Sequence, residues 1–167
     1  MKLTQKIRTC LWFDGQAEEA AAFYVAVFGD GRIGTILRYG SVGREIHGHA
    51  PGDVLVVEFE LHGQPFMALN GGPQFKFDEA ISFVLQCDTQ DEIDHYWNAL
   101  SDGGDERAQR CGWLKDRYGV SWQVVPTALN AMLTDPDAGK ADRVMAALLR
   151  MRKLDIAELQ QACEGLG

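Results

Sequence analysis

The sequence lacks long apolar runs and is short of basic residues. None of its 167 residues fall in an apolar stretch of about 18, and residues 1–8 show no signal-peptide pattern. Its 16 Lys and Arg stand against 24 Asp and Glu, which gives a formal net charge of −8. An acidic chain gains little from counterion release on nucleic acid, and an anionic membrane surface repels it. We therefore expect a cytoplasmic protein that binds neither nucleic acid nor membrane.

Cysteine is scarce and is not arranged for a disulfide framework or a zinc site. The four cysteines are Cys10, Cys87, Cys111 and Cys163. None belongs to a C-x-x-C pair, and no histidine stands at zinc-finger spacing from one. We interpret them as reduced, structural thiols, two of which fall in apolar strands.

The apolar residues that are present predict an α+β domain. Period-two or apolar strands are expected near residues 7–13, 33–39, 54–61, 64–70, 80–87, 109–115 and 121–125. Helical spacing of apolar residues predicts one helix over residues 16–28 and a second that opens at a Thr89–Glu92 capping box. His62-Gly63 is a compact hairpin signal, and residues 40–52 form a polar loop.

The pattern of the first half repeats in the second. Asp14-Gly15-Gln16 and Asp88-Thr89-Gln90 are 74 residues apart, and each joins an apolar strand to an amphipathic helix. The shared order of strand, helix and paired strands favours a duplication of one β-α-β-β-β module, at about residues 6–71 and 80–126. The alternative is an unrelated α+β domain that happens to contain two helices.

The C-terminal tail repeats nothing earlier. Asp135-Pro136 is typical of a helix start, and Asp155 with Glu158 resembles a capping box. The predicted helices share an apolar stripe, whose members are Val144, Leu148, Met151, Ile156 and Leu159. The stripe must cover either its own chain or that of a partner, and we predict that it contributes to a homodimer interface.

Three segments resemble the PhnB-like branch of the vicinal oxygen chelate superfamily, which includes glyoxalases and bleomycin-resistance proteins. They are Leu11-Trp12-Phe13-Asp14-Gly15-Gln16-Ala17-Glu18-Glu19-Ala20 with Phe23-Tyr24, Leu69-Asn70-Gly71-Gly72-Pro73, and Asp116-Arg117-Tyr118-Gly119-Val120-Ser121-Trp122-Gln123. The resemblance implies a glyoxalase-like domain over residues 1–133, with two modules that each form half of a cup, and a helical extension over residues 134–167. It also implies a homodimer.

Some members of that branch are labelled demethylubiquinone methyltransferases. Methyl transfer from S-adenosylmethionine usually uses a Gly-rich loop between a strand and a helix of a larger parallel α/β domain, and this sequence has neither. The label therefore does not set our expectation of function.

The resemblance also locates where metal-dependent members hold their ligands. The matching positions fall near Arg8 or Cys10, near Ala68 or Asn70, and at Ser82 and Gln123. Gln123 alone has a plausible donor, and one amide does not hold a divalent metal against water. We therefore predict no metal and no cofactor. His47-Gly48-His49 is the other candidate pair. A metal there requires two more donors, for which its loop supplies just Glu45 and Asp53, so we interpret the pair as part of a solvated loop.

The expected site is thus a cup that takes a small organic ligand. Strand alternation places Arg8, Cys10 and Trp12 on one face, so Cys10 is either a thiol activated by Arg8 or a packing residue. The predicted ligand-contacting residues are Cys10, Trp12, Asn70, Ser82, Gln86, Trp113 and Gln123, while alternation turns Trp122 into the core. The function predicted is metal-free binding of an unidentified small molecule. The alternatives are an enzyme of lyase, isomerase or transferase type on the same scaffold, or a purely structural dimer module.

Overall fold

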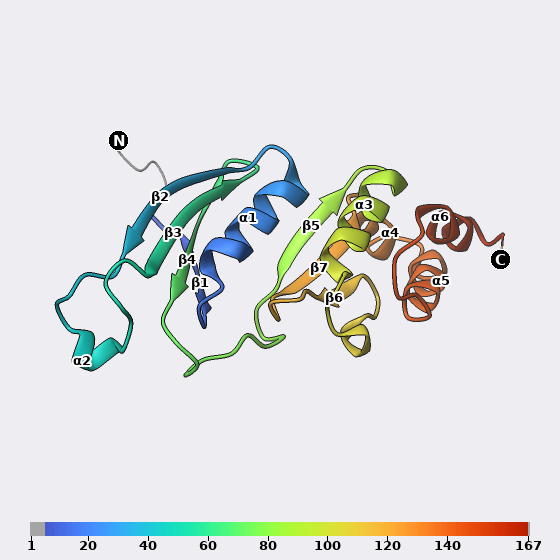
Figure 1. Cartoon of the computed structure of the whole chain (residues 1–167). Coiled ribbons are helices and arrows are strands. Elements are labelled where there is room, and N and C mark those ends of the chain that lie inside the picture. The colour runs from blue at the N-terminus through green and yellow to red at the C-terminus, as the bar shows by residue number, and fades with distance from the viewer. Residues whose placement is uncertain (1–5, 167) are drawn as a thin grey trace. The chain divides into compact units, whose positions relative to one another are not determined.

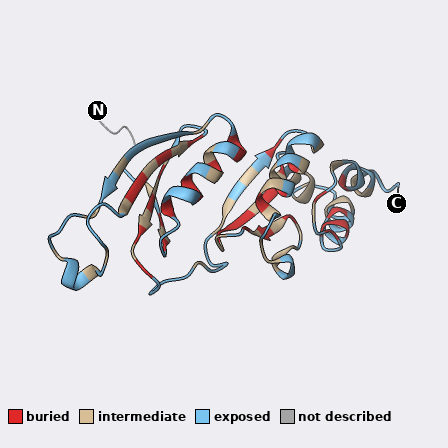
Figure 2. Cartoon of the chain, viewed as in Figure 1, coloured by how far each residue is buried: buried red, intermediate tan, exposed pale blue. Residues whose placement is uncertain are grey.

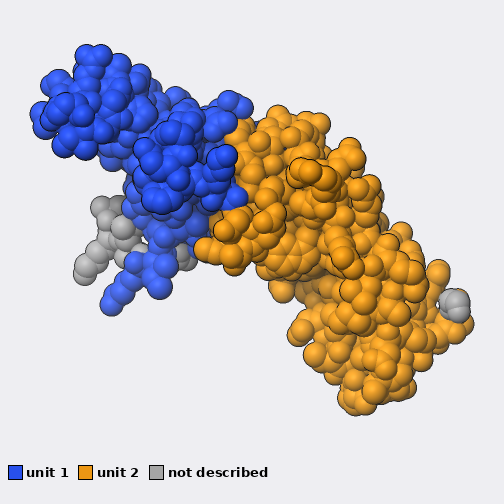
Figure 3. Space-filling model, turned by 90° about the horizontal axis from the view of Figure 1, so that it is seen from below, with its two compact units in different colours: residues 1–77 blue, residues 78–167 orange. Residues whose placement is uncertain are grey.

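A computed structural model describes residues 6–166 of the chain (Figure 1). The chain divides into two compact units, residues 1–77 and residues 78–167 (Figure 3). Each unit combines a β-sheet with helices, which confirms the α+β class. No helix within residues 6–166 is both long and apolar enough to cross a membrane.

The first unit is a four-stranded sheet with one long helix on it. Its strands are β1 (Thr9–Phe13), β2 (Arg32–Arg38), β3 (Val54–Leu61) and β4 (Gln64–Asn70), in the order β1-β4-β3-β2. β1 runs parallel to β4, and the other neighbours are antiparallel. Helix α1 (Ala17–Phe28) packs on one face, where Tyr24 stacks on Phe59. Figure 2 shows buried positions gathered on α1, β3 and β4.

Local sequence signals explain most element boundaries in this unit. The apolar residues that predicted α1 by their helical spacing are all buried: Ala17, Ala20, Ala21, Tyr24, Val27 and Phe28. The helix ends at Gly29, which has a φ of 74° that few other residues tolerate. His62 and Gly63 both have positive φ, as a two-residue hairpin of the favoured twist requires. The predicted polar loop differs in one respect: it contains a single helical turn, α2 (Arg44–His47), between Gly43 and Gly48.

The second unit contains a shorter version of the same arrangement. Its strands are β5 (Phe83–Cys87), β6 (Trp113–Lys115) and β7 (Ser121–Pro126), in the order β5-β7-β6 with β5 parallel to β7. Helix α3 (Gln90–Ser101) follows β5, and its Thr89–Glu92 capping box is confirmed. In residues 78–166 the helix is followed by two strands rather than three, with a 3₁₀ turn at Glu106–Ala108 between α3 and β6.

The strand predicted at residues 109–115 is shorter because the backbone turns within it. Cys111 and Gly112 both have positive φ. Their amide groups donate to the carbonyl groups of Met151 and Arg152 at 2.8 Å each, instead of to a neighbouring strand. Met151 and Arg152 therefore accept the backbone hydrogen bonds that a longer strand would have made with a neighbouring strand.

The tail packs on its own unit and not in an open stripe. It consists of α4 (Leu129–Leu133), α5 (Ala138–Leu148) and α6 (Ile156–Glu164). Four of the five predicted stripe residues, Val144, Leu148, Met151 and Leu159, lie in a buried cluster that also contacts Cys111 and Val125, and Ile156 is half-buried. The expectation that this stripe is left for a partner chain is therefore wrong.

The start of α5 also differs from the prediction. Its N-cap is Asp137, whose carboxylate accepts from the Gly139 amide, and Pro136 precedes the helix. Asp135 instead accepts from the Asp137 amide and so orients the cap. The predicted cap of α6 is correct, because Asp155 accepts from the Glu158 amide at 2.9 Å.

Candidate functional site

The sheet of the first unit has one face under α1 and one open face. Leu11 and Phe13 of β1 are buried toward the helix side, whereas Cys10 and Trp12 alternate onto the other face. Arg8 precedes β1 and lies on that same open face, where it reaches Glu58. The alternation predicted for Arg8, Cys10 and Trp12 is therefore present.

Strand register arranges the open face into three rows across the sheet. Cys10 pairs with Met67 and Trp12 with Leu69, while Glu58 pairs with Met67 and Val56 with Leu69. The row at one end is charged, and the row at the other end is apolar. From β1 to β2 the charged row holds Arg8, Pro65, Glu60 and Arg32, the middle row Cys10, Met67, Glu58 and Thr35, and the apolar row Trp12, Leu69, Val56 and Leu37.

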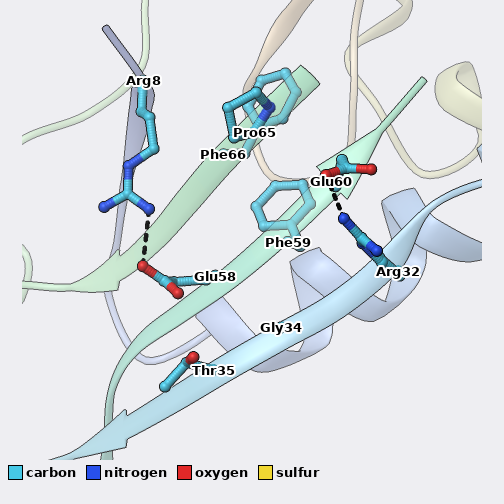
Figure 4. Close-up of a pocket in the computed structure, with 9 residues that line it drawn as sticks. All are labelled: Arg8, Arg32, Gly34, Thr35, Glu58, Phe59, Glu60, Pro65 and Phe66. Carbon is cyan, nitrogen blue, oxygen red and sulfur yellow. Dashed lines mark hydrogen bonds and ion pairs between the residues drawn. The ribbon is translucent and has the colours of Figure 1, made fainter. Parts of the chain in front are cut away.

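A pocket of about 550 Å³ lies at the charged end (Figure 4). Two ion pairs line it: the Arg8 Nη1 atom is 2.8 Å from a Glu58 oxygen, and the Arg32 Nη2 atom is 2.8 Å from a Glu60 oxygen. Arg8 comes from the segment before β1, Arg32 from β2 and both glutamates from β3. Two guanidinium groups and two carboxylates therefore balance in charge around one hollow.

The charged groups of this face stabilise the ionised form of Glu58 and do not activate the Cys10 thiol as a nucleophile. The hydrogen bond from Arg8 lowers the pKa of Glu58 below its usual value of 4.5, and a bond with Thr35 adds to this. Burial raises the pKa of the Cys10 thiol, and the nearby Arg8 charge offsets this effect in part. Cys10 is thus exposed but has no depressed pKa, which disfavours the reactive-thiolate interpretation.

The apolar end is built around Trp12. Its indole N–H donates to the Gly72 carbonyl at 2.8 Å, and its ring meets Phe75 edge-on with 4.9 Å between ring centroids. Gly71 lies against the indole so closely that a Cβ atom would stand 2.2 Å from the ring. The Gly71-Gly72 segment therefore fixes the indole, while Phe75 itself is largely exposed.

Asn70 has a different position from the one the sequence suggested. Because it pairs with Phe13 in the register, it points to the helix side of the sheet, where it is buried. Its amide oxygen accepts from the Ala17 amide at 2.9 Å, and its nitrogen donates to the Val54 carbonyl. Asn70 thus ties the start of α1 to the sheet and does not face the open surface.

The other predicted site residues belong to the second unit, on the face of its sheet away from Trp122 and Val124. The Gln123 amide donates to the Ser82 hydroxyl at 2.9 Å, and Trp113 pairs with Gln123 in the register. Gln86 is exposed on β5. Trp122 is buried as predicted, and its indole N–H donates to Asp116.

The donor set does not fit a resident metal. Of the positions matched to superfamily ligands, Ala68 has no donor, the Asn70 amide is engaged on the helix side, and Gln123 is bonded to Ser82. Within residues 6–166, no group of three or more His, Cys, Asp and Glu side chains lies close enough to hold a metal ion. We derive no chemistry through a metal.

The histidine pair of the polar loop has a structural arrangement. The ring of Tyr39 contacts both imidazoles, with centroid distances of 4.5 Å to His47 and 4.3 Å to His49. The Nδ1 atom of His47 accepts from the His49 amide, and its Nε2 atom faces the Val42 carbonyl. Because both ring nitrogens of His47 are engaged, the pair does not form an open ligand set.

The two glutamates of the pocket were missed at the sequence level, although a signal for them existed. In the strand Val54–Leu61, Glu58 and Glu60 alternate with the buried Phe59 and Leu61. Charges at alternate positions of an otherwise apolar strand usually indicate a solvated face, so this pattern did not stand out. Long-range pairing with Arg8, 50 residues away, turns that face into a pocket wall.

One family model and several solved structures match this chain. The sequence model of the 3-demethylubiquinone-9 3-methyltransferase family matches residues 5–125. The PhnB protein from Bacillus cereus is 36% identical, and the match covers 73% of this chain and 99% of that protein with a TM-score of 0.62. Among curated proteins, no sequence matches this chain.

Two further solved structures are similar to this chain. A protein from Staphylococcus aureus is 30% identical over 72% of this chain and 94% of its own length, with a TM-score of 0.32. A protein from Pseudomonas aeruginosa is 23% identical over 74% and 98%, with a TM-score of 0.55.

Proposed function

The chain belongs to the 3-demethylubiquinone-9 3-methyltransferase family, the PhnB-like branch of the vicinal oxygen chelate superfamily, and we propose that it binds a small organic molecule on the open face of its first unit without a metal. The observation that carries the proposal is the pocket between Arg8 and Arg32, which lies on the same face of the sheet as Cys10 and Trp12. Apolar walls with a few convergent polar groups are typical of small-molecule sites.

Binding is favoured over catalysis by the state of the polar groups. Glu58 and Glu60 each pair with an arginine. The lowered pKa of Glu58 makes its ion-paired carboxylate a weak general base. Cys10 lacks the depressed pKa of a nucleophile. An enzyme of lyase, isomerase or transferase type remains the alternative, and it would need a different acid–base pair.

Methyl transfer, the activity in the family's name, is not part of the function that we propose. The first strand-to-helix connection, Asp14-Gly15-Gln16, contains one glycine, and the strand before it belongs to a mostly antiparallel sheet. A nucleotide-type cofactor usually binds a Gly-rich loop at the end of a parallel strand. On the open face of the first unit, we propose Cys10 and Trp12 as ligand contacts. Ser82, Gln86, Trp113 and Gln123 remain candidate contacts on the sheet of the second unit, taken by itself.

The remaining parts of the proposal concern assembly and location. We propose a cytoplasmic homodimer whose glyoxalase-like part spans residues 1–133, with residues 134–167 as its helical extension. The family resemblance supports the dimer. The buried tail stripe gives it no support, because this stripe is covered within the second unit.

The proposal is tested with protein purified from untreated cell extract. We expect native mass spectrometry to show a bound organic molecule, released on denaturation, and crystals of the same material to show density beside Trp12. Protein that is ligand-free by both measurements, from several expression hosts, would contradict the binding function. Elemental analysis with about one zinc, nickel or manganese per chain would overturn the metal-free part alone.

A further inference from the structure

We infer that the ligand is an amphipathic carboxylate, with its carboxylate on Arg8 and its apolar body over Met67, Leu69 and Trp12. This inference rests on the proposed binding function and adds the chemical class of the ligand. It follows from the polarity gradient of the open face, which runs from an ion-paired row to an apolar row within one continuous surface.

Arg8 is the group on this face best placed to bind an anion. Its side chain is 24% exposed, against 65% for Arg32, so water screens it less. A guanidinium has five N–H donors. Among the residues that the structure describes, Arg8 donates one side-chain hydrogen bond, from Nη1 to Glu58. The remaining N–H donors of this partly buried guanidinium group suit a planar carboxylate.

The glutamates of the pocket favour an anion over a cation as the head group. Glu58 already accepts from Arg8 and interacts with Thr35, and Glu60 accepts from Arg32. Each glutamate charge is therefore compensated by a guanidinium, just as each guanidinium charge is compensated by a glutamate. Arg8 differs in that it keeps N–H donors beyond the one bonded to Glu58. A ligand carboxylate competes with Glu58 for the same guanidinium, so loss of the Glu58 charge should strengthen ligand binding.

The geometry of the strand sets the length of the ligand. Trp12 is four positions after Arg8, and an extended strand rises about 3.3 Å per residue, so the two residues are about 13 Å apart along the strand direction. An apolar body of about 10 Å, with a carboxylate at one end, spans this distance. Met67 and Leu69 on the neighbouring strand are half-buried and form the floor beneath it.

Isothermal titration calorimetry with octanoate and 1-octanol tests the inference, because the two probes differ in charge and share the apolar body. The wild-type protein should bind octanoate saturably, with one site per chain, and octanol at least 10-fold more weakly. Arg8→Gln should remove this preference, Arg8→Lys should restore part of it, and Glu58→Gln should tighten octanoate binding at least threefold. Arg107→Gln, which removes an exposed Asp105-paired arginine of the second unit, should change neither affinity.

The outcomes separate the ligand class from the binding function. Equal binding of octanoate and octanol, or octanoate binding unchanged in Arg8→Gln, overturns the carboxylate and leaves the proposed function intact. Failure of both probes to bind the wild-type protein also overturns the inference, while the molecule released from untreated protein still decides the function. Circular dichroism of each variant confirms that a lost signal is not lost folding.

Discussion

Contact between Gly71 and Trp12 determines how the apolar end of the open face is built. The indole ring lies where any side chain at Gly71 would extend, and a Cβ atom there would stand 2.2 Å from it. The Trp12 N–H bond to Gly72 holds the ring against this glycine pair. Space at one residue thus controls the orientation of a predicted ligand contact.

Gly71→Ala should therefore destabilise the protein by about 1–3 kcal/mol, since a methyl group forced into a packed site displaces its neighbour. Gly40→Ala is the matched control, because a Cβ atom at Gly40 meets no atom within 4 Å and should change stability by less than about 0.5 kcal/mol. Urea unfolding monitored by tryptophan fluorescence measures both. Equal stability of the two variants would show that Trp12 moves aside freely.

The Arg8–Glu58 pair predicts an acid-dependent part of the stability. Because the folded protein lowers the pKa of Glu58 below 4.5, the unfolded chain binds that proton more tightly. The contribution is therefore complete above about pH 4.5 and is lost as the pH falls through the lower, folded pKa. With the Glu58 side chain 37% exposed, solvent screening limits it to about 0.2–1 kcal/mol.

Arg8→Gln should accordingly lower the free energy of unfolding at pH 7, and the difference from wild type should shrink as the pH falls below 4.5. Chemical unfolding at pH 7, 4 and 3 measures this trend. In a Glu58→Gln background, the additional change Arg8→Gln should have no comparable pH dependence. A wild-type difference that grows on acidification would contradict the assignment to Glu58.

At the scale of single residues, local patterns were predictable and partners across the sheet were not. Alternation along β1 correctly separates Trp12 from Phe13, because two-residue periodicity is a property of the strand itself. The role of Asn70 depends on its pairing with Phe13, 57 positions earlier, which spacing alone does not reveal. The pocket depends in the same way on Arg8 and Glu58 meeting across β4.

Secondary-structure elements show the same division between local and distant causes. The capping box of α3, the hairpin at His62 and the end of α1 at Gly29 are all written in adjacent residues, and each was predictable. The short length of β6 was not predictable, because the amide groups of Cys111 and Gly112 before it donate hydrogen bonds to residues 151 and 152 of the tail. The tail thus completes the second unit rather than extending from it.

Leu159→Ala should destabilise the protein by about 2–5 kcal/mol, since Leu159 is fully buried in the tail cluster and its loss leaves a cavity. Leu149→Ala is the matched control, because Leu149 follows α5 and is 53% exposed. Thermal unfolding should separate the two clearly. Similar midpoints for both variants would mean that α6 is not held by this cluster.

At the scale of the whole molecule, the two units differ strongly in charge. Residues 1–77 hold seven basic and eight acidic side chains, whereas residues 78–167 hold nine basic and sixteen acidic ones. The negative charge of the chain is therefore concentrated in the second unit. The nearly neutral first unit is the one that contains the pocket, so an anionic ligand meets less overall repulsion there.

The proposed homodimer gives the last prediction, and it now concerns the surface of the first unit. The tail stripe is covered, whereas Val42 and Ile46 of the loop around α2 are 90% and 86% exposed. We propose these two exposed apolar side chains, four positions apart on one loop, as a contact site between copies of the chain. We expect the wild-type protein to sediment as a dimer and the double variant Val42→Asp/Ile46→Asp to shift toward the monomer while keeping its thermal midpoint. Leu149→Asp, at an apolar position of the tail that is 53% exposed, should remain a dimer. If the tail variant dissociates and the loop variant does not, the interface lies on the outer surface of the tail helices; a wild-type monomer would end the dimer proposal.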